Sequence, residues 1–88
     1  MKKTTELTDQ ECLEIYNANS GEELEEVEIE RSEYGTIEIH HVGGYDDMML
    51  TISKHGAIYL LCLDNNEIYH DVLGALEWLK NNQVAPFA

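Results

Sequence analysis

Hydrophobic residues near the N-terminus recur at the spacing of an amphipathic helix. This spacing extends over residues 9–18. Thr8 and Glu11 stand three residues apart, as the two partners of a helix-starting capping box do. Gly21 follows an Asn-Ser pair and is a typical left-handed residue at a helix end. The pattern therefore predicts a first helix from Asp9 to Ala18.

The middle of the chain alternates hydrophobic and polar residues with period two, which is typical of half-buried strands. In the first such segment, residues 26–31, Val27, Ile29 and Arg31 alternate with glutamates. Glutamate is a poor strand former, so helix is the alternative there, but the β-branched Val27 and Ile29 favour a strand. We expect further strands at residues 36–42, 48–53 and 57–63. The last of these is hydrophobic throughout, which predicts a strand covered on both faces.

A second helical stripe occupies residues 69–81. Its hydrophobic positions are Tyr69, Val72, Leu73, Leu76 and Leu79. Gly74 interrupts the stripe, and we expect it to mark a close approach of this helix to the sheet. The predicted order is α-β-β-β-β-α, an α+β fold with a four-stranded antiparallel meander between an N-terminal and a C-terminal helix. We expect a single domain over residues 1–88, with flexible tails at 1–7 and 83–88.

The charge of the chain is strongly unbalanced. Its 88 residues carry 18 acidic side chains against 5 lysines and arginines, a formal net charge of −13. Residues 6–47 hold 14 of the acids and a single base, Arg31. This balance excludes DNA, RNA or an anionic membrane as the main direct partner, because those surfaces require a positive patch. No hydrophobic run is long enough for a membrane span and no signal pattern is evident, so we expect a cytoplasmic protein.

Residue types that carry chemistry are present without a recognisable motif. Cys12 and Cys62 have hydrophobic neighbours, and we expect reduced, buried thiols rather than a disulfide. Four histidines and two neighbouring aspartates are potential metal ligands: His40, His41, His55, His70, Asp46 and Asp47. Their spacing matches no zinc or calcium signature, so we expect no metal and no cofactor. The serines and cysteines fit no nucleophile motif, and we expect no enzymatic activity.

The acidic side chains gather around the predicted first hairpin. On a regular strand Glu26, Glu28 and Glu30 would share one face at intervals of about 6.6 Å. A DNA strand presents one phosphate per about 3.4 Å of helix axis, so this ladder has about half of the linear charge density of DNA. The acids around the ladder would supply the remaining charge. The candidate partner-binding residues are Glu22, Glu23, Glu25, Glu26, Glu28, Glu30, Glu33, Tyr34, Glu38, Tyr45, Asp46 and Asp47.

Two alternatives apply to these residues. The acids could form a solvated surface that only keeps the protein soluble, although solubility does not require like charges on one hairpin. Tyr34 and Tyr45 lie in predicted turns, where they could anchor a protein partner or pack on their own hairpin.

A short acidic chain with a glutamate-rich hairpin resembles the small phage-encoded inhibitors of host defence. These include anti-restriction proteins, anti-CRISPR proteins and the uracil-DNA glycosylase inhibitor. The resemblance lies in size and charge and is carried by residues 22–30, Glu-Glu-Leu-Glu-Glu-Val-Glu-Ile-Glu. It implies a non-enzymatic inhibitor that mimics nucleic acid and occupies the basic nucleic-acid-binding surface of a nuclease or CRISPR effector.

Two other functions remain open. One is an immunity protein that neutralises a basic nuclease toxin through a few aromatic hot spots. The other is a structural or adaptor domain that forms a homodimer through the strand at 57–63 and the last helix, with the acids facing solvent.

Overall fold

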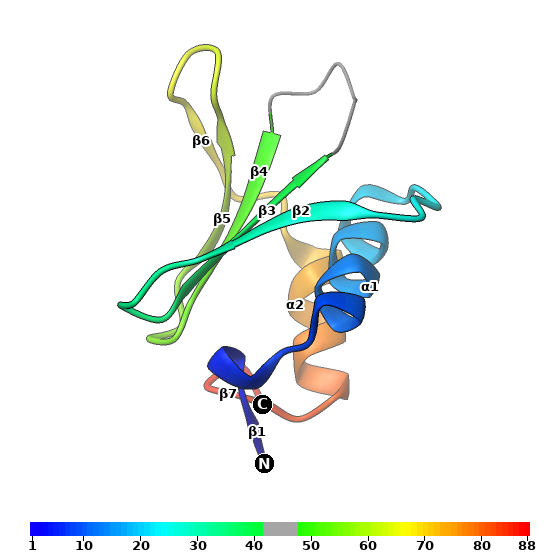
Figure 1. Cartoon of the computed structure of the whole chain (residues 1–88), viewed down its shortest axis with the longest axis vertical. Coiled ribbons are helices and arrows are strands. Elements are labelled where there is room, and N and C mark those ends of the chain that lie inside the picture. Colours follow the sequence, from blue (N-terminus) through cyan, green and yellow to red (C-terminus); the bar gives the residue numbers. More distant parts are fainter. Residues whose placement is uncertain (42–47) are drawn as a thin grey trace.

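The computed structural model describes residues 1–41 and 48–88 (Figure 1). Two α-helices, α1 and α2, pack against one large sheet, and a short 3-10 helix precedes α1. The elements are β1 (Lys2–Lys3), the 3-10 helix η1 (Thr4–Glu6), α1 (Asp9–Ser20), β2 (Val27–Arg31), β3 (Thr36–His41), β4 (Met48–Ser53), β5 (Ile58–Cys62), β6 (Ile68–Tyr69), α2 (Leu73–Asn81) and β7 (Val84–Ala85). The α+β class predicted from the sequence is confirmed.

The large sheet is an antiparallel meander of five strands in the order β2-β3-β4-β5-β6. The prediction of four strands was therefore wrong by one. Strand β6 pairs with β5 through Leu60 opposite Tyr69 and Leu61 opposite Ile68. Tyr69 accordingly belongs to a strand rather than to the last helix, and α2 begins at Leu73.

The start and the end of α1 follow the predicted signals. The Thr8 hydroxyl accepts a hydrogen bond from the Glu11 backbone N–H at 3.1 Å, and Glu11 Oε1 accepts one from the Thr8 N–H at 3.0 Å. These two bonds form the expected capping box. Gly21 has φ 76°, the left-handed conformation that glycine adopts without strain. The helix extends to Ser20, two residues beyond its predicted end.

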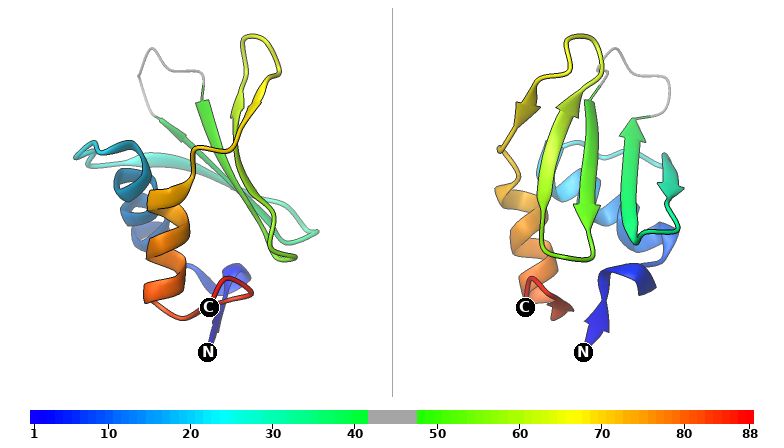
Figure 2. Two further views of the ribbon diagram at one scale, coloured as in Figure 1. Left: turned by 180° about the vertical axis from the view of Figure 1, so that it is seen from behind. Right: turned by 90° about the vertical axis from the view of Figure 1, so that its left-hand side faces the viewer.

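Both helices lie on the same face of the sheet (Figure 2). The core forms between them and the inward side chains of the strands, and includes Cys12, Ile15, Ile39, Leu50, Ile52, Ala75 and Leu79, each fully buried. Gly74 makes its close approach to α1 rather than to the sheet, because a Cβ at this position would overlap the Ala18 carbonyl oxygen. The prediction that Gly74 packs on the sheet was wrong.

No helix of the described residues covers the opposite face of the sheet (Figure 2). This arrangement corrects the expectation for the fourth predicted strand. All five residues of β5 are only half-buried, so the strand is not covered on both faces despite its continuous hydrophobic sequence.

The termini, which we expected as flexible tails, lie against the domain in the structure. Strand β1 pairs with β7 in parallel, with Lys2 opposite Val84. Thr4 and Val84 are 1% and 0% exposed. Both ends of the chain therefore contribute to the lower part of the core (Figure 1).

Candidate functional site

Several candidate residues lie on the sheet face turned away from the helices, which we call the open face. Successive side chains of a strand point to opposite faces, so the register assigns the members of this face. One row crosses all five strands and comprises Glu28, His40, Met49, Leu61 and Ile68. The next row comprises Glu30, Glu38, Thr51 and Tyr59.

The β2 side of the open face is acidic and has no compensating cation. Glu30 stands directly opposite Glu38, a pairing of like charges that destabilises a sheet. Across strands β2 to β6 the single lysine or arginine is Arg31, which points to the helix side and binds Asp9 Oδ1 at 2.7 Å. Within residues 1–41 and 48–88, Glu28, Glu30 and Glu38 have no ion pair and no side-chain hydrogen bond.

The β4 side of the open face is less polar and more buried. Met49 and Thr51 are 6% and 2% exposed, although no described helix covers them. The Thr51 hydroxyl and His40 Nε2 are buried and have no hydrogen-bond partner among residues 1–41 and 48–88. Buried polar groups almost always have partners, so such exceptions need an explanation. Met49 and Thr51 were not among the residues predicted for the site, although the alternation along residues 48–53 places them on this face.

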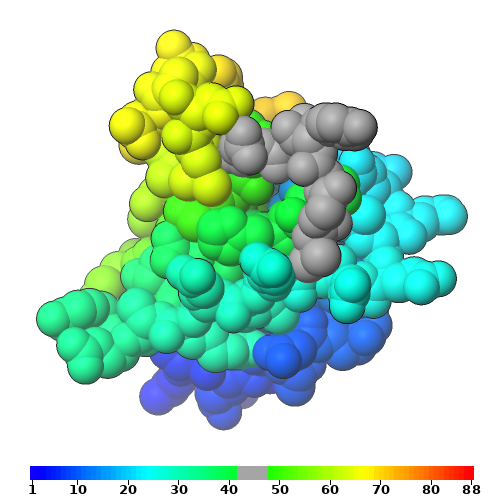
Figure 3. All heavy atoms as spheres, turned by 45° about the horizontal axis from the view of Figure 1, so that its top comes forward, coloured from blue at the N-terminus to red at the C-terminus, as the bar shows by residue number. Residues whose placement is uncertain are grey.

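The segment between α1 and β2 displays further acids from a fixed backbone. Asn17 binds Leu24 twice, as its Nδ2 donates to the Leu24 carbonyl at 3.0 Å and its Oδ1 accepts from the Leu24 N–H at 3.0 Å. Glu22 and Glu23 are exposed, and Glu22 Oε2 lies 3.8 Å from His41 Nδ1. Figure 3 shows this segment in cyan, at one end of the surface that β2 forms.

The turn between β2 and β3 projects at the other end of that surface (Figure 3). The Ser32 N–H donates to the Thr36 carbonyl at 2.9 Å, and Gly35 takes φ 86° to close the turn. Tyr34 is 74% exposed beside the exposed Glu33, so its ring does not pack on its own hairpin. The other predicted anchor, Tyr45, and the acids Asp46 and Asp47 lie outside the described residues.

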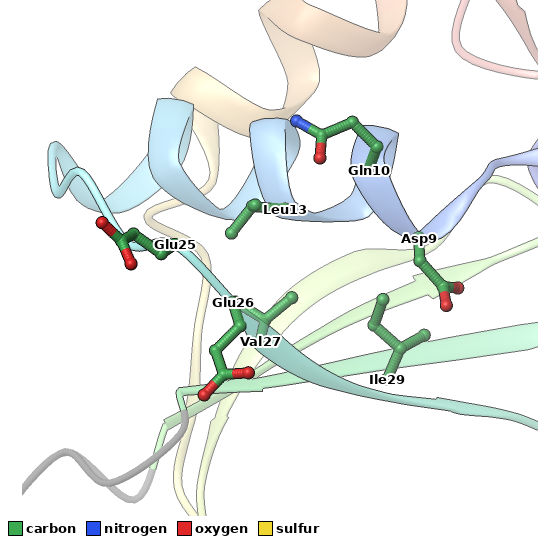
Figure 4. A pocket seen from close by; sticks show the side chains of 7 residues that line it. All are labelled: Asp9, Gln10, Leu13, Glu25, Glu26, Val27 and Ile29. Atoms are coloured by element: carbon green, nitrogen blue, oxygen red, sulfur yellow. The ribbon is translucent and has the colours of Figure 1, made fainter.

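A groove of about 240 Å³ separates the first half of α1 from β2 (Figure 4). Leu13, Val27 and Ile29 form its hydrophobic walls, and its remaining lining residues are Asp9, Gln10, Glu25 and Glu26. Glu25 and Glu26 therefore lie beside this groove, just before β2. The prediction that Glu26 belongs to the strand ladder with Glu28 and Glu30 was wrong, because β2 begins at Val27. The α1 residues of the groove were missed because they are distant from the hairpin in the sequence.

Asp9, which lines the groove, also forms the ion pair with Arg31. The same guanidinium lies 4.0 Å from the Cys12 sulfur. Burial raises the pKa of the Cys12 thiol to about 11, so this residue stays protonated and is a poor nucleophile at neutral pH. Both Cys12 and Cys62 are free thiols, and Cys62 is only partly buried.

Residues 1–41 and 48–88 contain no group of three or more histidine, cysteine or acidic side chains that could hold a metal ion. Within the same ranges, neither helix has the length and hydrophobicity to cross a membrane. Comparison of the chain with protein-family models, curated proteins and solved structures found no match.

Proposed function

We propose that this protein is a non-enzymatic inhibitor whose open face binds the basic nucleic-acid-binding surface of a partner protein. The observation that carries the proposal is the group of Glu28, Glu30 and Glu38. These three carboxylates share one face of the sheet, without an ion pair or a side-chain hydrogen bond in the described structure. Folding places like charges opposite each other at a cost in stability, and a cationic partner would reverse that cost.

The spacing of these carboxylates also supports the proposal. Residues two apart on a strand lie about 6.6 Å from each other, and directly opposed residues on antiparallel strands lie about 5 Å apart. Glu28, Glu30 and Glu38 therefore present negative charges about 5–7 Å apart. A nucleic-acid strand is likewise a row of closely spaced negative charges, with one phosphate per about 3.4 Å of helix axis. Glu22, Glu23 and Glu33 extend the negative surface at its two ends.

Displacement of labelled DNA from purified restriction endonucleases, CRISPR effectors and uracil-DNA glycosylase tests the proposal. We expect the protein to displace DNA from at least one of them, and to do so less effectively as salt rises. A variant with Glu28→Gln, Glu30→Gln and Glu38→Gln should lose most of this activity. The control variant, with Glu14→Gln, Asp64→Asn and Glu77→Gln, removes the same charge from outside the open face and should retain it. Equal loss in both variants would contradict the proposal.

A second candidate function is supported by exposed hydrophobic side chains at the β6 end of the sheet, away from the acidic β2 side. Leu63, Ile68, Tyr69 and Leu73 are 46%, 54%, 40% and 69% exposed around β6 and the start of α2. Large exposed hydrophobic groups in one region favour a protein contact there. This region adjoins β5 and α2, the elements through which we expected an adaptor domain to dimerise. Sedimentation at low and high salt would detect such a dimer, because a hydrophobic interface is resistant to salt.

A further inference from the structure

Strand β2 forms one edge of the large sheet, and one side of its backbone has no strand partner in the described structure. The Ser32 N–H donates to the Thr36 carbonyl at 2.9 Å. This bond shows which opposed residues of β2 and β3 form hydrogen-bonded pairs. Hydrogen-bonded pairs alternate along an antiparallel ladder, so Glu28 and Glu30 direct their backbone groups to β3. The N–H and C=O groups of Val27, Ile29 and Arg31 consequently face away from the sheet.

The hydrogen bond between the Lys54 N–H and the Gly35 carbonyl, at 3.2 Å, independently supports this assignment of the hydrogen-bonded pairs. It implies that the backbone groups of Ile37 and Ile39 form hydrogen bonds with β4. The backbone groups of the residues between them on β3 therefore form hydrogen bonds with β2. Strand β2 contains no proline, no lysine and no irregularity in its register. Of the features that usually protect an edge strand it has charged side chains, Glu28, Glu30 and Arg31, and the two glutamates disfavour an added strand that is not basic.

The groove between α1 and β2 runs beside this free edge (Figure 4). Its hydrophobic side chains, Leu13, Val27 and Ile29, are half-buried, and Glu25 and Glu26 lie exposed at the start of the strand. A further strand added here would place alternate side chains beside Val27 and Ile29, against α1. The side chains between them would lie beside Glu28 and Glu30, on the open face.

We propose that the free edge of β2 binds an extended segment of a partner protein, with alternating basic and hydrophobic residues, as a sixth strand of the sheet. The hydrophobic residues of that segment fill the groove below α1, and the lysines or arginines contact Glu28 and Glu30. The acids at the groove exclude an acidic segment. A second copy of β2 is also excluded, because antiparallel pairing of two such strands would bring the glutamates of one strand opposite those of the other. The pairing does not require that the partner bind nucleic acid.

Amide hydrogen exchange of the ¹⁵N-labelled full chain tests this proposal with a short capped peptide of alternating lysine and valine as the probe. At saturating peptide we expect exchange to slow at least about tenfold at Val27, Ile29 and Arg31, because their amides gain hydrogen bonds. The amides of Glu28 and Glu30 should change little, since β3 already protects them. A peptide with glutamate in place of lysine should not bind.

Two variants with equal loss of charge separate this edge from general electrostatic attraction. The variant with Glu28→Gln and Glu30→Gln should bind the lysine-valine peptide about fivefold more weakly, because it lacks the carboxylates that the lysines contact. The variant with Glu14→Gln and Glu77→Gln should bind it nearly as well as the unaltered protein. The proposal is overturned if the peptide does not bind at millimolar concentration, if it binds without slowing the three amides, or if both variants lose affinity equally.

Discussion

Glu11 holds the start of α1 through three contacts. It completes the capping box with Thr8 and forms an ion pair with Lys2 on β1. The Lys2 ammonium and the Thr8 backbone N–H lower the pKa of the Glu11 carboxyl below its ordinary value of 4.5. A carboxyl whose pKa is lower in the folded state stabilises the fold above its unfolded pKa, and this contribution disappears as the pH falls through the folded pKa.

We therefore expect Glu11→Ala to lower the free energy of unfolding by about 1 kcal/mol at pH 7. The difference from the unaltered protein should shrink as the pH falls below 4.5. Urea unfolding at several pH values measures it. Glu14→Ala, at an exposed position of the same helix, is the control and should have little effect at any pH. A pH-independent loss at Glu11 would mean that the carboxylate charge does not contribute.

Thr51 carries a buried hydroxyl at the centre of the open face, and the described part of the chain offers it no hydrogen-bond partner. Burying an unsatisfied hydroxyl costs about 1–3 kcal/mol, and valine has the same branched shape without the polar atom. Thr51→Val should therefore raise the free energy of unfolding by about 1 kcal/mol. Thr8→Val is the opposite control, because the Thr8 hydroxyl accepts from the Glu11 N–H and its removal should destabilise α1. A destabilised Thr51→Val variant would show that the hydroxyl is satisfied in solution.

At the scale of elements, the contact between α1 and α2 depends on a glycine. A Cβ on Gly74 would overlap the Ala18 carbonyl oxygen, which belongs to the backbone and cannot move aside cheaply. We expect Gly74→Ala to destabilise the protein by about 1–3 kcal/mol, as measured by urea unfolding. An unhindered helical glycine would instead gain about 1 kcal/mol on substitution by alanine. A stabilised variant would therefore contradict this packing of the helices.

The elements that local patterns specify were predictable from the sequence. The capping box and Gly21 located α1, and alternation located β2, β3 and β4 to within one residue of their ends wherever the structure describes them. Strand β6 was missed because it has only two residues and its Tyr69 fits the helical spacing of α2. Strands β1 and β7 were missed because their pairing joins opposite ends of the chain and leaves no local pattern.

The candidate site was predictable to the same extent. Alternation placed Glu28, Glu30 and Glu38 on one face of a hairpin, and the register of β2 and β3 confirms that arrangement. The groove could not be predicted, because Asp9 and Leu13 reach β2 only through the packing of α1 on the sheet. Single-strand patterns thus predict a face of a sheet, whereas a groove between layers requires the tertiary fold.

At the scale of the whole molecule, a net charge of −13 opposes the compact state. The described residues form three ion pairs, one of which involves a histidine, so most of the acids are uncompensated. Sodium chloride should therefore raise the melting temperature of the protein. An increase of 1 kcal/mol in the free energy of unfolding corresponds to a rise of roughly 4–8 °C in a domain of this size. The variant with Glu28→Gln, Glu30→Gln and Glu38→Gln should respond less. A melting temperature that is indifferent to salt would contradict this account of the charge.

The most direct test of the central claim is the salt dependence of binding to a basic partner found by DNA displacement. We expect the logarithm of the affinity to fall linearly with the logarithm of the salt concentration, as in binding of a nucleic acid to the same surface. The variant with Glu28→Gln, Glu30→Gln and Glu38→Gln should have a smaller slope. The matched variant with Glu14→Gln, Asp64→Asn and Glu77→Gln should keep the full slope. An affinity independent of salt, or equal slopes in the two variants, would contradict the assignment of the open face as the binding surface.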